Sequence, residues 1–193
     1  MSERPRVVAL CGSLRDGSHT RTALDVALAA AADRGARTDP IDLRSLDLPL
    51  YDADEEAIGD VADLKTRVRA ADAILLGTPM YHGSYSSPLK TALDYCGFDE
   101  FEDTTVGLLA VSGGSFPITA LDHLRAVCRA LDAWVLPHQA AVPNASRKIE
   151  GGEIVDSGVA ERVAVLGERA VEYAAIEPDP PCFESEENVG AVD

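Results

Sequence analysis

The chain has 193 residues, of which 46% are hydrophobic, and a formal net charge of −16 at pH 7. This length and composition fit a single domain with a sizeable core and exclude a chain that is disordered throughout. The acidity disfavours nucleic acid and anionic membrane surfaces as partners, because both are bound through basic patches.

Other composition features concern where the protein works. No apolar run approaches the ~20 residues of a membrane span, and the first residues carry no signal-peptide pattern. The four cysteines are scattered, without a C-x-x-C pair: Cys11, Cys96, Cys128 and Cys182. This usage favours small core residues in a reducing cytoplasm over a disulfide framework or a metal site. We therefore expect a cytoplasmic protein without membrane insertion and without a bound metal.

The basic residues are mostly arginine. Lysine occurs only at Lys65, Lys90 and Lys148, and arginine supplies the other fourteen of the seventeen basic residues. An acidic, lysine-poor surface is typical of proteins from a salt-rich cytoplasm, where salt screens the self-repulsion. A biased genomic base composition is the alternative. We expect a halophile.

Hydrophobic periodicity predicts strands and helices in alternation along the chain. Buried strands are expected within residues 7–10, 36–43, 73–77, 106–111 and 134–142. Amphipathic helices are expected within residues 22–32, 61–71, 89–96, 121–131 and 159–170. This alternation predicts an α/β fold with a doubly wound, five-stranded parallel sheet in one domain, residues 1–176. The Pro- and acid-rich residues 177–193 are expected to form a disordered C-terminal tail.

The first strand leads into a polar turn, residues 12–21, with the sequence GSLRDGSHTR. Backbone N–H groups in such a turn, together with the positive end of the following helix, favour an anion. The hydroxyls of Ser13, Ser18 and Thr20 suit a phosphate, as do the guanidinium groups of Arg15 and Arg21. An ordinary strand-to-helix turn, with Ser18 or Thr20 as the helix N-cap, is the alternative.

The turn matches neither of two common phosphate loops. Gly12 and Gly17 have the spacing of a P-loop, but Ser18 and His19 stand where Lys and Ser/Thr are required. A G-x-G-x-x-G dinucleotide fingerprint is also missing. The turn therefore disfavours an ATPase and favours a terminal phosphate, as on a mononucleotide. His19 is expected to face solvent.

Two further loops follow the third and fourth strands: residues 78–88, TPMYHGSYSSP, and residues 112–117, SGGSFP. In a doubly wound sheet, ligands bind beyond the carboxyl ends of the strands, near the switch in strand order. All three loops fall at those ends. The sequence therefore predicts one ligand site formed by segments that are far apart along the chain.

With these loops in place, the chain resembles the NAD(P)H-dependent FMN reductases of the flavodoxin-like superfamily, which include quinone, chromate and azo reductases. The resemblance spans roughly residues 7–143. It is carried by GSLRDGSHT (12–20), LPLYDAD (48–54), GTPMYHGSYSSPLKTALDY (77–95) and SGGSF (112–116). It implies a flavodoxin-like sheet of order 2-1-3-4-5 with helices on both faces, FMN as cofactor and NAD(P)H as co-substrate.

The resemblance also implies which residues bind FMN. The phosphate is expected to be bound by Ser13, Arg15, Ser18 and Thr20. The ribityl chain and the isoalloxazine ring are expected to be lined by Pro79, Met80, Tyr81, His82, Gly83 and Ser84. The loop that closes over the other side of the flavin is Ser112, Gly113 and Gly114. Met80 and His82 depart from the residues that are commoner in the family.

No catalytic acid or base is assigned, because hydride transfer between stacked rings needs orientation more than a side-chain base. The resemblance further implies a homodimer or homotetramer, with Leu89, Lys90 and the following helix in the interface. Lys90 could instead steer the anionic cofactor or pair with an acidic neighbour. We expect Tyr81 to cover the flavin ring rather than only pack a subunit interface, and Trp134 to lie in the core.

These features predict a flavin reductase that passes electrons from NAD(P)H to free flavin, a quinone or a similar small acceptor. Two alternatives lack NAD(P)H activity. One is a flavodoxin-like electron-transfer protein, and the other is a flavin-binding protein that acts through contact with a partner.

Overall fold

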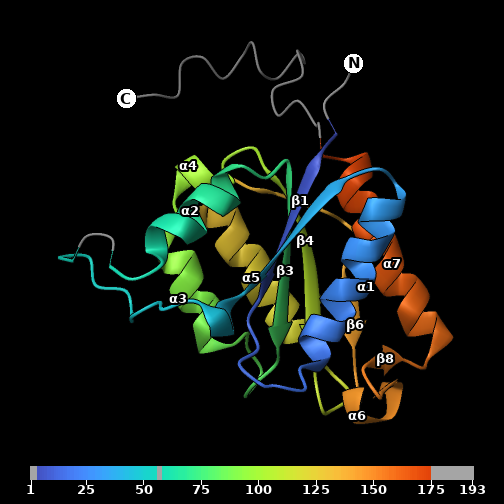
Figure 1. Cartoon of the computed structure of the whole chain (residues 1–193). Coiled ribbons are helices and arrows are strands. Elements are labelled where there is room, and N and C mark those ends of the chain that lie inside the picture. The colour runs from blue at the N-terminus through green and yellow to red at the C-terminus, as the bar shows by residue number, and fades with distance from the viewer. Residues whose placement is uncertain (1–3, 56–57, 175–193) are drawn as a thin grey trace, which may run out of the picture.

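The computed structural model describes residues 4–55 and 58–174 (Figure 1). The expected tail, residues 177–193, and Cys182 lie outside the described residues. The sheet consists of β1 (Arg6–Cys11), β2 (Arg37–Asp42), β3 (Ala73–Pro79), β4 (Thr105–Val111), β5 (Trp134–Val135) and β6 (Ala140–Val142). The strands follow the order β2-β1-β3-β4-β5, β6 also pairs with β4, and all these pairs are parallel. The predicted strand order is confirmed.

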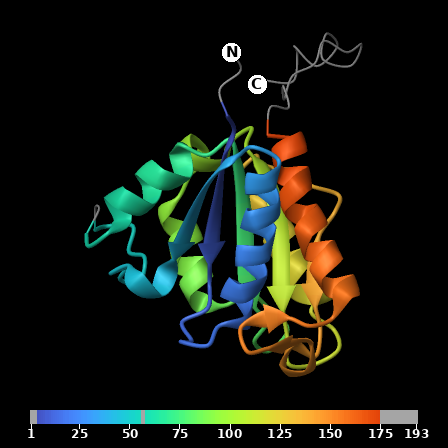
Figure 2. The ribbon, with the colours of Figure 1, turned by 45° about the vertical axis from the view of Figure 1, so that its right-hand side comes forward.

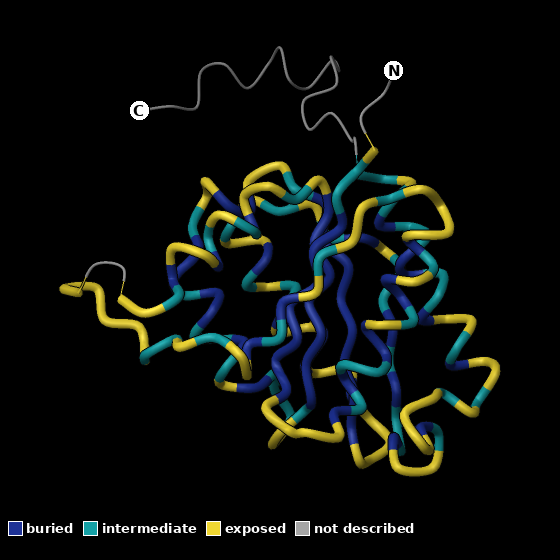
Figure 3. The backbone as a smooth tube through the Cα atoms, in the orientation of Figure 1, coloured by how far each residue is buried: buried dark blue, intermediate teal, exposed yellow. Residues whose placement is uncertain are grey.

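Helices cover both faces of the sheet (Figures 1 and 2). The helices α1 (His19–Asp33) and α7 (Ser157–Glu172) pack on one face. The helices α2 (Val61–Arg69), α3 (Ser87–Tyr95) and α5 (Ile118–Ala130) pack on the other. Side chains alternate between two hydrophobic cores, with Val7 and Ala9 in the first and Val8 and Leu10 in the second. Every residue of β3 and β4 is buried, as expected for central parallel strands (Figure 3).

Two glycines allow α1 to lie close against its neighbours. A Cβ atom on Gly167 of α7 would lie 1.9 Å from the carbonyl oxygen of Ala27. A Cβ atom on Gly77 of β3 would lie 2.6 Å from a methyl group of Leu24. Because real Cβ atoms do not approach other atoms this closely, both contacts depend on the missing side chain. They set the position of α1, whose N-terminus opens onto the carboxyl edge of the sheet.

The fifth strand, expected within residues 134–142, is present but interrupted. The chain pairs with β4 at β5, where the Leu136 N–H also donates to the Val106 carbonyl at 2.9 Å, leaves the ladder over residues 137–139, and pairs again at β6. Pro137 lies in this interruption and has no N–H group to donate to a ladder. Trp134 was expected in the core, but its position on the edge strand leaves it 43% exposed.

Several short elements were not predicted from the sequence. They are a 3₁₀ turn (Leu43–Ser45), α4 (Phe98–Phe101), α6 (Ala145–Lys148) and the hairpin strands β7 (Ile149–Glu150) and β8 (Glu153–Ile154). Gly151 and Gly152 form the tight turn of that hairpin, with φ of +59° and +86°. Within the described part of the chain, no helix is both long enough and apolar enough to cross a membrane.

Candidate active site

A cavity of about 160 Å³ lies at the carboxyl ends of β1, β3 and β4, and we call it the loop cavity. All three loops singled out in the sequence contribute to it. Its lining consists of Ser13, Arg15, His19, Thr20, Pro79, Met80, Tyr81, Val111, Ser112, Gly113, Ala145 and Ser146. Among these lining residues there is no Asp or Glu, although the whole chain carries a net charge of −16. The cavity therefore suits an anion.

The structure separates the expected site residues into two groups. Those in the lining are Ser13, Arg15, Thr20, Pro79, Met80, Tyr81, Ser112 and Gly113. Those outside the lining are Ser18, His82, Gly83, Ser84 and Gly114. The lining also contains residues that sequence reasoning did not select. Ala145 and Ser146 come from α6, whose place beside the third loop no local pattern indicated.

Ser18 is the N-cap of α1, as the alternative interpretation of the turn proposed. Its Oγ atom accepts a hydrogen bond from the backbone N–H of Arg21 at 3.1 Å, and its side chain is 4% exposed. This contact satisfies one of the N–H groups that a helix start leaves unpaired. Ser18 therefore shapes the start of α1, while Ser13 and Thr20 belong to the lining of the loop cavity.

The two guanidinium groups of the first loop have different roles. Arg21 pairs with Asp42 at the end of β2 (Nη1 to Oδ2, 2.6 Å) and donates to the backbone carbonyls of Arg15 and Asp16. Arg21 thus holds the loop against the sheet and is absent from the lining. Arg15 is exposed and lies in the lining, so its guanidinium is the one available to a ligand.

His19 was expected to face solvent. The structure instead makes it the first residue of α1, half-buried and in the lining of the loop cavity. His19 therefore borders the loop cavity, which the local sequence of the turn did not indicate.

The first and second loops are held together by buried hydrogen bonds. The backbone N–H of Gly12 donates to the carbonyl of Gly77 (2.8 Å), and the Ser86 hydroxyl donates to the carbonyl of Gly12 (2.7 Å). Thr78 Oγ1 accepts from the Ser86 backbone N–H at 2.9 Å. A Cβ atom on Gly12 would lie 2.7 Å from the Ser86 hydroxyl. Thr78 and Ser86 are therefore positioning residues that sequence reasoning missed.

The second loop turns sharply at residues 81–84. Tyr81 and Ser84 exchange backbone hydrogen bonds of 3.0 and 3.1 Å, and the central residues His82 and Gly83 have φ of +50° and +82°. Two positive φ values are typical of a type I′ turn. The Ser84 hydroxyl lies 2.9 Å from Nδ1 of His123 on α5, which anchors the turn. Tyr81 is left 52% exposed at the mouth of the loop cavity.

The third loop leaves open space above its glycines. The Ser112 hydroxyl donates to the carbonyl of Gly114 at 2.6 Å, and Ala145 N–H donates to the carbonyl of Ser112 at 2.9 Å. Cβ atoms built on Gly113 or Gly114 would meet no atom within 4 Å, and neither residue has a positive φ. Protein packing and backbone conformation therefore do not require glycine here. A flat ligand lying against the backbone would, because a side chain would occupy its place.

The described cysteines are buried and have no disulfide partner. Burial raises the pKa of the Cys11 thiol, and it raises the pKa of Cys96 and of Cys128 to about 12. These thiols are protonated at neutral pH and do not act as nucleophiles. No group of three or more potential metal-ligating side chains occurs among the residues that the structure describes.

The sheet order, with helices on both faces and a polar turn between β1 and α1, defines the class of protein: a flavodoxin-like α/β domain. Two solved structures share this fold. An NADH:FMN oxidoreductase in its apo form has a TM-score of 0.74 at 23% identity, over 90% of this chain and 92% of that one. FerB, an NAD(P)H:acceptor oxidoreductase from Paracoccus denitrificans, has a TM-score of 0.75 at 22% identity, over 88% and 97%.

Sequence comparison identifies the family within that class. Residues 5–147 match the family model of the NADPH-dependent FMN reductases. The chain is also 38% identical over 143 residues to the FMN-dependent NADPH-azoreductase of Staphylococcus aureus (strain USA300), covering 68% of this chain and 73% of the relative. The chain belongs to the NADPH-dependent FMN reductase family, and it is an oxidoreductase with FMN as cofactor and NAD(P)H as co-substrate. The resemblance found in the sequence is confirmed.

Proposed function

We propose that the loop cavity binds FMN and that the protein passes electrons from NAD(P)H to a small acceptor: free flavin, a quinone or an azo compound. One observation carries the assignment of the site. Three loops from distant parts of the chain meet at one cavity whose lining contains an arginine and several hydroxyls but no carboxylate. In a chain this acidic, such a lining favours a phosphate over any cationic ligand.

In this proposal, the phosphate end of FMN lies deepest in the loop cavity. Arg15 offers a planar pair of N–H donors, and the hydroxyls of Ser13 and Thr20 add neutral donors. The first N–H groups of α1 lie at the same point and favour negative charge. Ser18 and Arg21 act indirectly, because their side chains hold the helix start and the loop in place.

The ring of FMN lies across the mouth of the loop cavity. At about 160 Å³ the cavity is smaller than the ~300–1,000 Å³ of sites that enclose a drug-sized ligand. It therefore encloses only part of FMN, and the ring extends over Gly113 and the exposed Tyr81. When bound, FMN supplies the two-electron chemistry that links the nicotinamide to the acceptor. The chain's residues orient the ring and leave one face open to both substrates.

The open face of the bound ring is accessible to several kinds of small acceptor. The Staphylococcus aureus relative is named an azoreductase, so an azo dye joins free flavin and quinones as candidates. Turnover with each acceptor, measured first with NADH and then with NADPH, tests this part of the proposal. A protein that oxidises NAD(P)H but reduces none of these acceptors would refute it.

Binding of FMN at the loop cavity is tested with Gly113→Val. Because a Cβ atom at Gly113 meets no protein atom within 4 Å, the variant is expected to fold normally while its side chain occupies the space proposed for the ring. We expect FMN affinity to fall at least ~10-fold, a loss of about 1.4 kcal/mol. Gly17→Val is the matched control, since Gly17 also has no neighbour within 4 Å and lies outside the lining. Unchanged FMN binding by Gly113→Val would place the ring elsewhere.

We propose a homodimer or homotetramer whose interface includes the groove beside the first loop. This groove, of about 320 Å³, is lined mainly by apolar side chains, and its Leu50 is 83% exposed. Leu89, which the resemblance placed in the interface, is fully buried within one chain, and Lys90 pairs with Asp94 at 2.5 Å. Light scattering tests the assembly: Leu50→Glu is expected to yield a monomer, and a monomeric wild type would refute the proposal.

We further propose that the protein works in the cytoplasm of a salt-adapted cell. The support is the net charge of −16 together with only three lysines among seventeen basic residues. The dependence of the melting temperature on salt concentration tests the second part of this proposal.

A further inference from the structure

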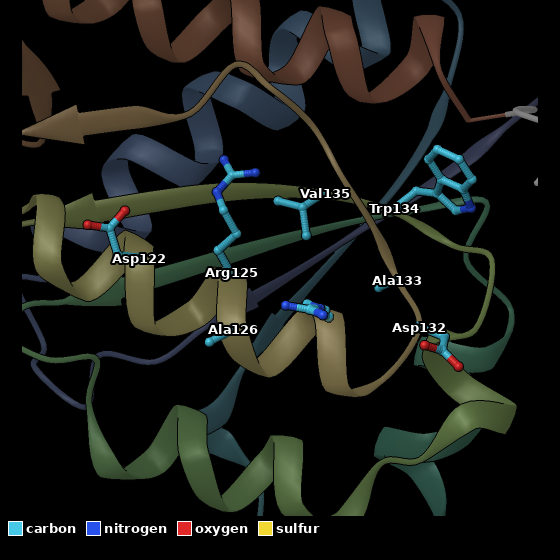
Figure 4. A pocket seen from close by; sticks show the side chains of 8 residues that line it. Asp122, Arg125, Ala126, Asp132, Ala133, Trp134 and Val135 are labelled. Atoms are coloured by element: carbon cyan, nitrogen blue, oxygen red, sulfur yellow. The ribbon is translucent and has the colours of Figure 1, made fainter.

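Two cavities adjoin the edge strand β5, at the end of the sheet away from the loop cavity. One, of about 560 Å³, lies between β5 and α7, and the other, of about 660 Å³, lies between β5 and α5 (Figure 4). Trp134 and Val135 line both cavities. We call the two cavities together the β5 groove. Because β5 pairs only with the start of β4, its outer edge is open among the described residues.

The β5 groove combines an apolar floor with positive charge. Trp134 is 43% exposed, and the strand residues beside it are apolar. The charged residues of the lining are Arg125, Arg129, Arg169, Asp122 and Asp132, and His138 and Tyr173 also line it. Arg125 already donates to Gln139 at 2.8 Å, and Arg169 pairs with Glu172 at 2.7 Å. Arg129 forms no ion pair with any residue that the structure describes. An acidic segment with apolar side chains matches this surface.

The described part of the chain ends beside the groove, and the sequence that follows has this character. Tyr173 lines the groove, and its carbonyl accepts a hydrogen bond of 2.6 Å from the Thr105 hydroxyl. Thr105 in turn pairs with Trp134 across the sheet. The chain therefore continues from Ala174 beside Trp134. Residues 175–193, AIEPDPPCFESEENVGAVD, contain six acidic residues and no Lys or Arg.

We propose that residues 175–183 of the same chain occupy the β5 groove. The apolar Ile176 and Phe183 pack against Trp134, and the carboxylates of Glu177 and Asp179 face the arginines of the groove. Nine extended residues span up to about 30 Å, which is enough to run along β5. Attachment to α7 gives the segment a high effective concentration, so weak contacts suffice.

Three further residues of the segment suit this place. Pro178, Pro180 and Pro181 favour an extended conformation, which reduces the entropy lost on docking. A docked segment would also cover an open sheet edge, which otherwise is a template for pairing with other chains.

Trp134 is the only tryptophan of the chain, so its fluorescence reports on the groove directly. We expect acrylamide to quench the full-length wild type weakly. The triple variant Glu177→Gln/Asp179→Asn/Phe183→Ser should be quenched about twofold more strongly, with red-shifted emission, because the ring becomes exposed. Arg129→Gln should change quenching in the same direction. The matched control, Glu186→Gln/Glu187→Gln, alters acids outside the docked residues and should behave as wild type. Equal quenching of wild type and triple variant would overturn the proposal.

A second measurement distinguishes this segment from other occupants of the groove. The described cysteines are at most 7% exposed, so a nitroxide reagent for thiols labels Cys182 of the folded protein. We expect the label to quench Trp134 strongly in wild type and weakly in the triple variant. The effect should not change across a dilution series, because the contact lies within one chain. Protection of Trp134 that disappears on dilution would assign the groove to a second copy and refute the proposal.

Discussion

Replacement of Arg15 by alanine tests the proposed phosphate site most directly. The Arg15 side chain has no hydrogen-bond or ion-pair partner among the described residues; only its backbone N–H and carbonyl take part in the loop. The variant should therefore fold as wild type. Its expected effect is confined to ligand binding.

The size of the effect follows from the exposure of Arg15. A hydrogen bond to a charged group contributes about 1.5–3 kcal/mol. Arg15 is exposed, so solvent screening places its contribution near the lower end. A loss of ~1.5–2 kcal/mol corresponds to an increase of about 10–30-fold in the dissociation constant of FMN.

The assay is a titration at fixed ionic strength with FMN and, separately, with riboflavin, which lacks the phosphate. We expect Arg15→Ala to weaken FMN binding and to leave riboflavin binding unchanged. Arg34→Ala is the control, because it makes the same change in net charge at a surface ion pair outside the lining of the loop cavity. Equal weakening for both ligands, or unchanged FMN affinity, would refute the proposed contact between Arg15 and the phosphate.

Three further predictions concern stability. Gly167→Ala should lower the free energy of unfolding, measured in urea, by about 1–3 kcal/mol, because its Cβ would lie 1.9 Å from the carbonyl oxygen of Ala27. Gly158→Ala in the same helix is the control, because its Cβ would have its closest neighbour at an ordinary 3.6 Å. Hydrogen bonds from Arg67, which contributes most, and from Arg6 hold the pKa of Asp39 below its usual value. The stabilisation from this depressed pKa is therefore present above the unfolded pKa of about 3.9 and lost as pH falls through the folded pKa. At neutral pH, Asp39→Asn should cost about 1 kcal/mol after allowance for solvent screening, and its stability should fall less steeply in acid than that of wild type; an equally steep fall would contradict this. If the acidic surface is a salt adaptation, the melting temperature should rise from dilute buffer to molar salt, and a melting temperature independent of salt would count against it.

Local patterns were sufficient for much of the fold and for the meeting of the three loops at one edge of the sheet. Runs of buried residues marked β1, β3 and β4, and the spacing of apolar residues marked the long helices. The three loops could be placed at one edge because parallel strands carry their carboxyl ends to the same side. The strand order and the identity of the cofactor came from the resemblance, and the comparisons confirmed them.

Roles that depend on a distant partner could not be predicted. Arg15 and Arg21 look equivalent in the sequence, and only the position of Asp42 beside Arg21 assigns that guanidinium to the scaffold. Trp134 looks like a core residue until its strand is seen to lie at the edge of the sheet. Glu100 looks like a surface acid but is 2% exposed, and it is held by Arg69 at 2.6 Å.

The sequence by itself determined the alternation of elements and the chemical character of the three loops, because both depend on residues that are close together along the chain. The tertiary structure decided which polar groups of those loops bind one another and which remain for a ligand. The Ser86 hydroxyl bonds to Gly12 across 74 positions of sequence, while Ser13 stays in the lining. Such choices depend on which strands pair and how closely α1 packs, and these are properties of the whole chain.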